Sequence, residues 1–285
     1  MADNAGMMSN GNSVSSFQAV MRIALETNVR RLSRQPRTSL LTLSLKRPNL
    51  MPLSRRAIDP RHLMVMQQAN RREQVQSVTA GLEKARAILE GTRPATWVFT
   101  GDTVVQGAGQ TGAGRTFSEH FGDHLRNKLR RLLDVVINTG VPNSRADNFL
   151  KTLDWRVTRF APEVVFLMLG SADAAAGPTG RTRFREVLNE IIDTLSKTKT
   201  ALILQTPPTA RPDHWTDATD LPAYVEIVRE VADARDVAGI DHWSLFEDRL
   251  AHAEAEPDWW SSGGQLPNVR GHVELARQVV EALSR

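Results

Sequence analysis

Four short motifs of glycine, hydroxyl, amide and carboxyl residues follow apolar segments in the second two-thirds of the chain. A side-chain hydroxyl can attack an acyl carbon when a base takes its proton, and backbone amides can hold the oxyanion that forms. Carboxylates can orient such a base. The residue types therefore point to acyl-transfer chemistry, provided that the fold brings them together. The motifs are Gly101-Asp102-Thr103, Gly140, Gly170-Ser171-Ala172-Asp173 and Leu266-Pro267-Asn268.

Short apolar runs alternate with segments of helical periodicity from about residue 95 onward, and this alternation predicts a parallel sheet covered by helices. Strands are expected at 96–100, 135–138, 164–169, 201–205 and 239–241, and helices at 117–131, 145–160, 181–196, 221–235 and 269–283. Five such strands favour a doubly wound, flavodoxin-like order, in which ligands bind beyond the carboxyl ends of the strands. Three of the motifs directly follow a predicted strand and the fourth opens the last helix, so all four are expected at one edge of the sheet.

With these motifs in this order over about 190 residues, the chain resembles the SGNH, or GDSL-type, hydrolases. The resemblance implies a three-layer α/β/α domain. It also implies that Thr103 stands where the family has its nucleophilic serine, and that Gly140 supplies an oxyanion amide. Ala172 replaces the asparagine that is the third oxyanion donor, while Gly263 and Leu266 replace the catalytic aspartate and histidine.

Every catalytic side chain of the family is therefore changed, and only the backbone amides at Thr103 and Gly140 remain to bind an oxygen. This favours a non-catalytic, esterase-like protein that binds a small molecule, a carbohydrate ester or a partner at the crevice. The alternative is an active ester hydrolase, a carbohydrate deacetylase or short-chain esterase. In that case Thr103 attacks, and His242 or a histidine from a loop is the base.

The other polar residues near these motifs have structural interpretations. Asp102 and Asp173 are expected to cap helices or turns, the glycine-rich stretch 107–114 to form a flexible rim loop, and His272 to be non-catalytic. His120 and His124 are expected on a solvated helix face, so neither a metal nor a cofactor is predicted. Tryptophans near the crevice either stack on a ligand or are buried under a folded-back loop; these are Trp215, Trp259 and Trp260.

Charge is unevenly placed along the 285 residues, which contain no cysteine and hence no disulfide or thiolate site. Residues 1–75 carry 12 Lys and Arg against 4 Asp and Glu, a net of +8, which leaves 24 basic and 28 acidic residues, a net of −4. The basic arm lacks interleaved aromatics and nucleic-acid motifs, so nucleic acid is not the favoured partner. Neither a signal peptide nor a membrane span is predicted, which favours the cytoplasm.

Three regions are expected: a basic arm over 1–58 that is flexible or ordered by a partner, a long helix and linker over 59–94, and the α/β domain over 95–285. Asp59-Pro60 is a typical helix start, and Val75, Val78, Leu82, Ala85 and Leu89 form one apolar stripe. The stripe packs either on the domain or on another copy. We expect self-association or docking to a larger assembly through the arm.

Overall fold

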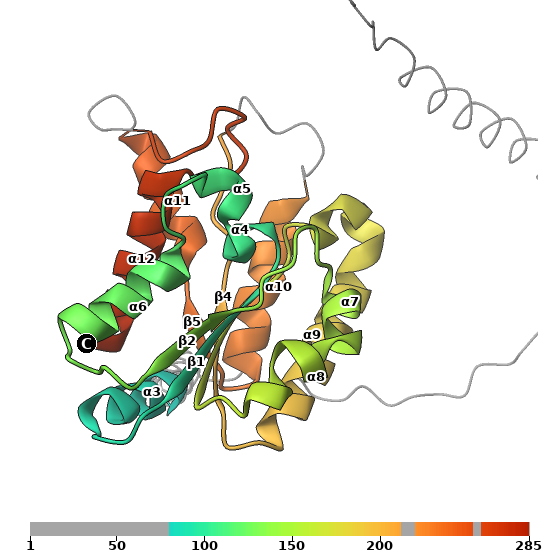
Figure 1. Cartoon of the computed structure of the whole chain (residues 1–285). Helices are drawn as coiled ribbons and strands as arrows, with labels where there is room; N and C mark the ends of the chain where they lie inside the picture. The colour runs from blue at the N-terminus through green and yellow to red at the C-terminus, as the bar shows by residue number, and fades with distance from the viewer. Residues whose placement is uncertain (1–79, 212–219, 253–257, 285) are drawn as a thin grey trace, which may run out of the picture. The chain divides into compact units, whose positions relative to one another are not determined.

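The computed structural model describes residues 80–211, 220–252 and 258–284. They form a five-stranded parallel sheet in the order β2-β1-β3-β4-β5 (Figure 1). The predicted doubly wound α/β fold is confirmed. The expected helix start at Asp59-Pro60 and the arm over 1–58 lie outside the described residues. The strands are β1 (Thr96–Gly101), β2 (Val135–Asn138), β3 (Val164–Met168), β4 (Ala201–Gln205) and β5 (Ala238–Ile240).

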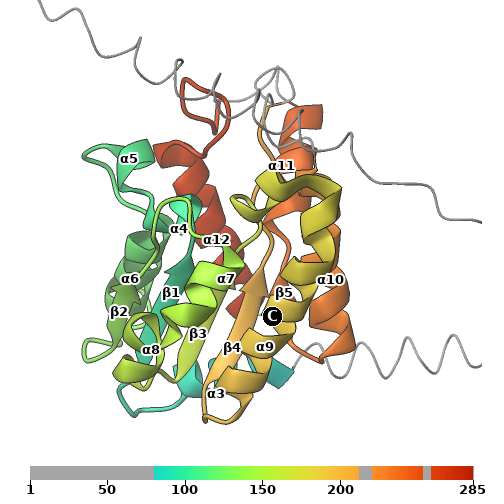
Figure 2. The same cartoon turned by 90° about the vertical axis from the view of Figure 1, so that its right-hand side faces the viewer.

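Helices cover both faces of this sheet, as the two side views show (Figures 1 and 2). One face carries α3, α6, α11 and α12, and the other carries α7, α8, α9 and α10. The α-helices are α3 (Ala80–Glu90), α4 (Thr103–Gln106), α5 (Ala108–Thr111), α6 (Phe117–Asn127), α7 (Ala146–Lys151), α8 (Leu153–Arg156), α9 (Arg181–Ser196), α10 (Leu221–Ala234), α11 (His242–Ala251) and α12 (Val269–Ser284). The 3-10 helices are η1 (Thr158–Phe160) and η2 (Asp173–Gly180).

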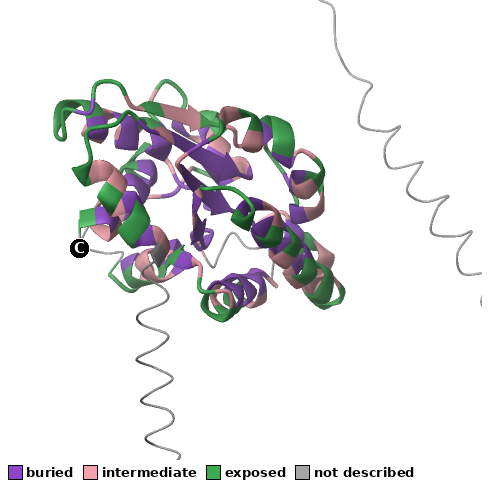
Figure 3. Cartoon of the chain, turned by 90° about the horizontal axis from the view of Figure 1, so that it is seen from below, coloured by how far each residue is buried: buried purple, intermediate pink, exposed green. Residues whose placement is uncertain are grey.

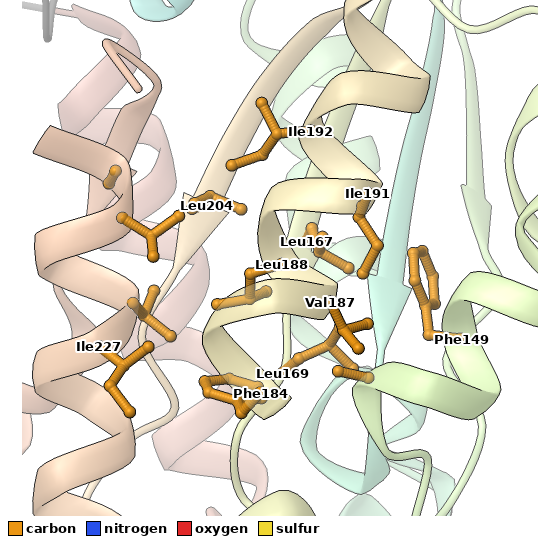
Figure 4. Close-up of a cluster of buried hydrophobic side chains, with 14 of the residues drawn as sticks. Phe149, Leu167, Leu169, Phe184, Val187, Leu188, Ile191, Ile192, Leu204 and Ile227 are labelled. Carbon is orange, nitrogen blue, oxygen red and sulfur yellow. The ribbon is translucent and has the colours of Figure 1, made fainter. Parts of the chain in front are cut away.

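The central strands are buried on both sides, which explains why they are apolar throughout rather than alternating. In β3 all five residues are buried. Leu167 packs with α9 and α10 in one core, and Phe166 stacks on Phe99 in the other, with ring centroids 4.4 Å apart. Figure 4 shows the first core, where Leu188 and Ile191 of α9 lie against the sheet. Seen from below, buried residues gather between the helices and the sheet (Figure 3).

Several helices differ from the expected ones. The helix expected over 145–160 is broken into α7, α8 and η1, because Thr152 and Val157 leave helical dihedrals. The glycine-rich stretch expected as a rim loop contains the short helix α5, and α11 was not expected at all. Leu82 and Ala85 of α3 belong to the domain core, so this part of the apolar stripe packs on the domain.

In the described part of the chain, no helix is both long and apolar enough to cross a bilayer.

Candidate functional site

The turn after β1 brings the Gly101-Asp102-Thr103 motif to the carboxyl edge of the sheet. Gly101 has φ of +151°, and a Cβ there would lie 2.0 Å from the carbonyl oxygen of Met168. Only glycine therefore lets β1 run so close to β3 before it turns into α4. Asp102 is fully buried and caps α4 by accepting a hydrogen bond of 3.0 Å from the Val104 amide.

Burial raises the pKa of Asp102, while hydrogen bonds from the Ser171 side chain and the Val104 amide oppose the rise. The carboxyl group of Asp102 thus has a structural role, which is to stabilise the turn into α4.

Thr103, the first residue of α4, is half-buried, and its hydroxyl group already has a partner. Oγ1 accepts a hydrogen bond of 2.9 Å from the backbone amide of Asn143. The backbone carbonyl oxygen of Thr103 accepts a hydrogen bond of 2.7 Å from Gln110 Nε2. A lone pair that accepts a hydrogen bond is less available for attack, so this geometry does not activate the hydroxyl.

Gly140, which was expected to supply an oxyanion amide, has that amide engaged by a neighbouring side chain. Its amide donates to Asn138 Oδ1 at 2.9 Å, and a Cβ on this residue would lie 2.4 Å from the Gln106 amide nitrogen. Glycine is required here for close packing of the loop against α4. The amide that faces the Thr103 hydroxyl belongs to Asn143, three residues further along.

Asn143 was not identified from the sequence. Its φ is +56°, in the left-handed region that glycine and asparagine tolerate best. The Pro142-Asn143 pair is a turn signal, but a turn signal alone does not show which amide faces the crevice.

The loop after β3 contributes Ala172 and Asp173. Ala172 is half-buried, and its methyl group can donate no hydrogen bond. Asp173 is 5% exposed, and its Oδ1 accepts 2.9 Å from the Ala146 amide. Its Oδ2 is buried and has no partner among the described residues. Burial raises the pKa of Asp173 to about 6, against the lowering effects of the Ala146 amide and of Arg145.

The last motif keeps its backbone frame without the catalytic side chains. Asn268 caps α12, since its Oδ1 accepts from the amides of Arg270 and Gly271 at 2.8 and 3.1 Å. Its Nδ2 donates to the Trp260 carbonyl oxygen at 2.8 Å. Gly263 is exposed and Leu266 half-buried, and neither side chain can move a proton.

His242, the candidate relocated base, is fully buried at the start of α11. Its Nε2 lies 2.7 Å from the amide oxygen of Gln205, and its Nδ1 contacts the amide of Gln278. Burial lowers the pKa of His242 to about 4. Both ring nitrogens of His242 contact side-chain amide oxygens, one of Gln205 and one of Gln278. Neither nitrogen is therefore engaged with Thr103, which favours the structural interpretation of this residue.

His272 is also buried, and it reaches Thr103 only through another side chain. Its Nδ1 accepts 3.2 Å from the Phe117 amide, and its Nε2 lies 3.2 Å from Gln110 Oε1. Gln110 in turn bonds the Thr103 carbonyl, not the hydroxyl. Burial lowers the pKa of His272 to about 4, so this histidine ties α12 to the α4–α5 turn as a neutral group.

Arg156 contacts the loops after β1 and β2 and was not identified from the sequence. It is 1% exposed. It donates to the Thr139 carbonyl at 3.1 Å and to Ser144 Oγ at 2.8 Å, and it also bonds the Gly101 carbonyl. Burial lowers the pKa of Arg156 to about 10, and the nearby Asp102 charge opposes this. Arg156 thus joins the loops after β1 and β2, and nothing in its local sequence distinguishes it from a surface arginine.

The remaining candidate residues that the structure describes have no hydrogen bond to Thr103 or its neighbours in the motif after β1. Trp260 is buried and donates to the Thr209 carbonyl at 2.8 Å, so it fastens the last loop to the domain. Trp259 packs against Phe246. His120 and His124 are half-buried on α6, and the pKa of each is lowered by burial. Trp215 lies outside the described residues.

A cavity of about 630 Å³ lies between α11 and α12, and its lining contains no residue of the four motifs. Among the residues with defined positions, no group of three His, Asp or Glu side chains is arranged to hold a metal ion.

Solved structures with this fold include several esterases. An acetyl xylan esterase named AlAXEase has 20% sequence identity and a TM-score of 0.57, over 66% of this chain and 98% of its own. The acetylxylan esterase Axe2 from Geobacillus stearothermophilus has 16% identity and a TM-score of 0.56, over 67% and 94%. LAE5, an alpha/beta hydrolase from the metagenome of Lake Arreo, Spain, has 19% identity and a TM-score of 0.57, over 67% and 95%.

No relative was found among curated protein sequences. The family model of the GDSL-like lipases and acylhydrolases matches residues 99–273, from β1 into α12. This match includes all four motifs of the crevice, and the chain belongs to the GDSL-like lipase/acylhydrolase family.

Proposed function

We propose that this protein is a non-catalytic member of its family that binds a ligand or partner at the crevice without hydrolysing it. The hydrogen bond from the Asn143 amide to Thr103 Oγ1 is the observation that carries the proposal. The hydroxyl group at the nucleophile position is held as an acceptor, and the position that should provide its base is Leu266. The buried histidines His242 and His272 have their nitrogens engaged elsewhere.

The expected losses in rate are large enough to separate this proposal from a weakened enzyme. Removing the base of a catalytic triad costs roughly 10⁴-fold or more, and removing one oxyanion donor about 10²- to 10³-fold. The two losses do not simply multiply, but the loss of the base is the larger one and counts most against the family mechanism.

Ligand binding needs fewer groups than catalysis, and the crevice retains some of them. The Asn143 amide can donate to a ligand oxygen that displaces the Thr103 hydroxyl. AlAXEase and Axe2 are described as acetyl xylan esterases, so an acetylated oligosaccharide is the ligand class to test first.

Ester hydrolysis is tested on the full chain with p-nitrophenyl acetate and acetylated xylo-oligosaccharides, beside a Thr103→Ala variant. We expect the same background release of acetate from both proteins. Acetate release that disappears with Thr103→Ala would overturn the proposal. It would favour the second candidate, an active ester hydrolase whose base comes from a loop such as the one carrying His214, outside the described residues.

Binding is tested by calorimetry with acetylated and deacetylated xylo-oligosaccharides. Ala172→Leu should weaken binding, because a larger side chain at this half-buried position fills the crevice. Ala175→Leu, an exposed neighbour on η2, is the matched control. Equal effects of the two substitutions would place the ligand elsewhere.

A further inference from the structure

A group of apolar side chains faces solvent where α6 leads into β2. The exposed fractions are 42% for Leu129, 69% for Leu132, 74% for Leu133 and 51% for Val135. We call these four residues, with Lys128 and Arg130, the leucine corner. The loop that carries it lies at the lower end of the sheet in Figure 1.

The backbone of the leucine corner is fixed by buried polar contacts. Arg131 is 9% exposed. It donates to Asp134 Oδ2 at 2.6 Å and to the carbonyl oxygens of Leu89 and Arg93 at 3.2 and 2.8 Å. Asp134 in turn accepts 2.8 Å from Trp97 Nε1. The turn that carries the leucines is therefore held in place by Arg131 and Asp134, while the leucine side chains face water.

No described residue covers these leucines, so folding leaves the free energy of burying them available to a partner. Burying a leucine side chain is worth about 1.5–3 kcal/mol, and Leu132 and Leu133 are adjacent. Contiguous exposed apolar side chains with a basic rim are typical of an interaction surface.

The charge of the leucine corner is positive. Lys128 and Arg130 are exposed, and neither side chain forms an ion pair with any described residue. The acidic residue of the turn, Asp134, is 3% exposed and is paired with Arg131. Two copies of this corner packed face to face would bring like charges together, so an anionic surface is the complementary partner.

The position of the leucine corner agrees with a flat anionic partner. It ends at Val135, the first residue of β2, and so lies at the end of the sheet opposite the carboxyl ends of the strands. The chain enters the domain at the same end, because a Cβ on Gly81 would lie 2.9 Å from the side chain of Ala238, the first residue of β5. The 75 residues at the N-terminus carry a net charge of +8.

We propose that the leucine corner docks this protein on an anionic lipid bilayer. The side chains of Leu132 and Leu133 insert at the boundary between headgroups and acyl chains, and Lys128 and Arg130 contact phospholipid headgroups. The crevice then faces away from the bilayer.

The test measures co-flotation of the full chain with phosphatidylcholine vesicles and with vesicles containing about one-third phosphatidylserine. Binding is expected to the anionic vesicles only. Leu132→Ser with Leu133→Ser should weaken it about tenfold, because apolar area no longer enters the bilayer. Lys128→Gln with Arg130→Asn should weaken it by a similar factor; asparagine suits the φ of +57° at Arg130.

Two substitutions at exposed sites elsewhere are the matched controls. Val273→Ser removes an apolar side chain that is 41% exposed on α12, and Lys151→Gln removes an exposed charge on α7; both should bind like the unchanged protein. Binding that the leucine changes leave intact would assign it to the basic N-terminal region and overturn the proposal. No binding to either vesicle would also overturn it, as would a dimer in light scattering that the leucine changes dissociate.

Discussion

At the scale of single residues, Asp173 is a buried carboxyl group whose pKa is raised. The pKa of Asp173 lies at about 6 because burial disfavours its charged form. The native state therefore holds this proton more tightly than the unfolded chain does. The free energy of unfolding should fall as pH rises from about 4 to about 6, by on the order of 2 kcal/mol.

Asp173→Asn should remove the part of this pH dependence that Asp173 contributes, leaving that of Asp102, and should make the protein more stable than the unchanged chain at pH 7. Urea unfolding at several pH values measures the difference between the two proteins. Asp154→Asn, at an exposed position on α8, controls for the loss of a carboxylate. Parallel stability curves for the unchanged protein and Asp173→Asn would contradict the raised pKa.

Asn143 is a second residue whose backbone conformation makes a prediction. With φ at +56°, a residue with a Cβ and no local hydrogen bonding is strained by about 1–2 kcal/mol. Asn143→Ala should lower the free energy of unfolding by about 1 kcal/mol, while Asn143→Gly should leave it unchanged or raise it slightly. Denaturant unfolding measures both, with Asn148→Ala on α7 as the control. Equal stability of the alanine and glycine variants at position 143 would contradict the strain.

At the scale of elements, α3 is the helix for which the sequence left two alternatives, packing on the domain or on another copy of the chain. Ala85 is fully buried and Leu82 is 9% exposed, and Arg86 donates to the Ala282 carbonyl of α12 at 2.7 Å. The helix closes the face of the sheet that α6 and α12 also cover. It is therefore part of the domain, which was expected to begin only at residue 95.

A chain that begins at Ala80 should fold cooperatively, whereas one that begins at Thr96 should not, because it leaves the side chains of β4 and β5 around Ala201 and Ala238 uncovered. Truncation at 96 removes contacts worth several kcal/mol by the cost of exposing core residues. Thermal unfolding by near-UV circular dichroism compares the two chains. Equal melting temperatures would show that α3 is dispensable.

The strands were predictable because each is a short, continuous apolar run, and the doubly wound order was predictable because five such runs alternate with helices. Helix ends were less predictable. The helix α6 ends at Asn127, and Arg130 shortly after it has a positive φ, which the local sequence did not indicate. The motif positions were predictable, but the amide that faces Thr103 was not, since loop geometry decided between Gly140 and Asn143. Arg156 was missed because its partner Gly101 lies 55 residues away.

Considered as a whole molecule, the protein has the fold of the GDSL-like family, with its four motifs held in place by local contacts. Asp102 caps α4, Asn268 caps α12, and the sheet brings the loops after β1 and β3 to one edge. If the proposed loss of activity lies in four side chains, restoring those side chains should restore hydrolysis.

The four substitutions Thr103→Ser, Ala172→Asn, Gly263→Asp and Leu266→His test this directly. Each fits its site, because Ala172 has φ of −76°, a Cβ on Gly263 would meet nothing within 4 Å, and Leu266 is only half-buried. The combined variant should hydrolyse p-nitrophenyl acetate at least about 10²-fold faster than the unchanged protein, since a positioned base alone contributes this much. The control carries Thr103→Ala in place of Thr103→Ser beside the other three substitutions, and it should show no gain. A combined variant that folds with an unchanged melting temperature yet hydrolyses no faster would mean that the crevice has changed beyond these four side chains, with the Asn143 amide and the Gln110 contact as the first places to look.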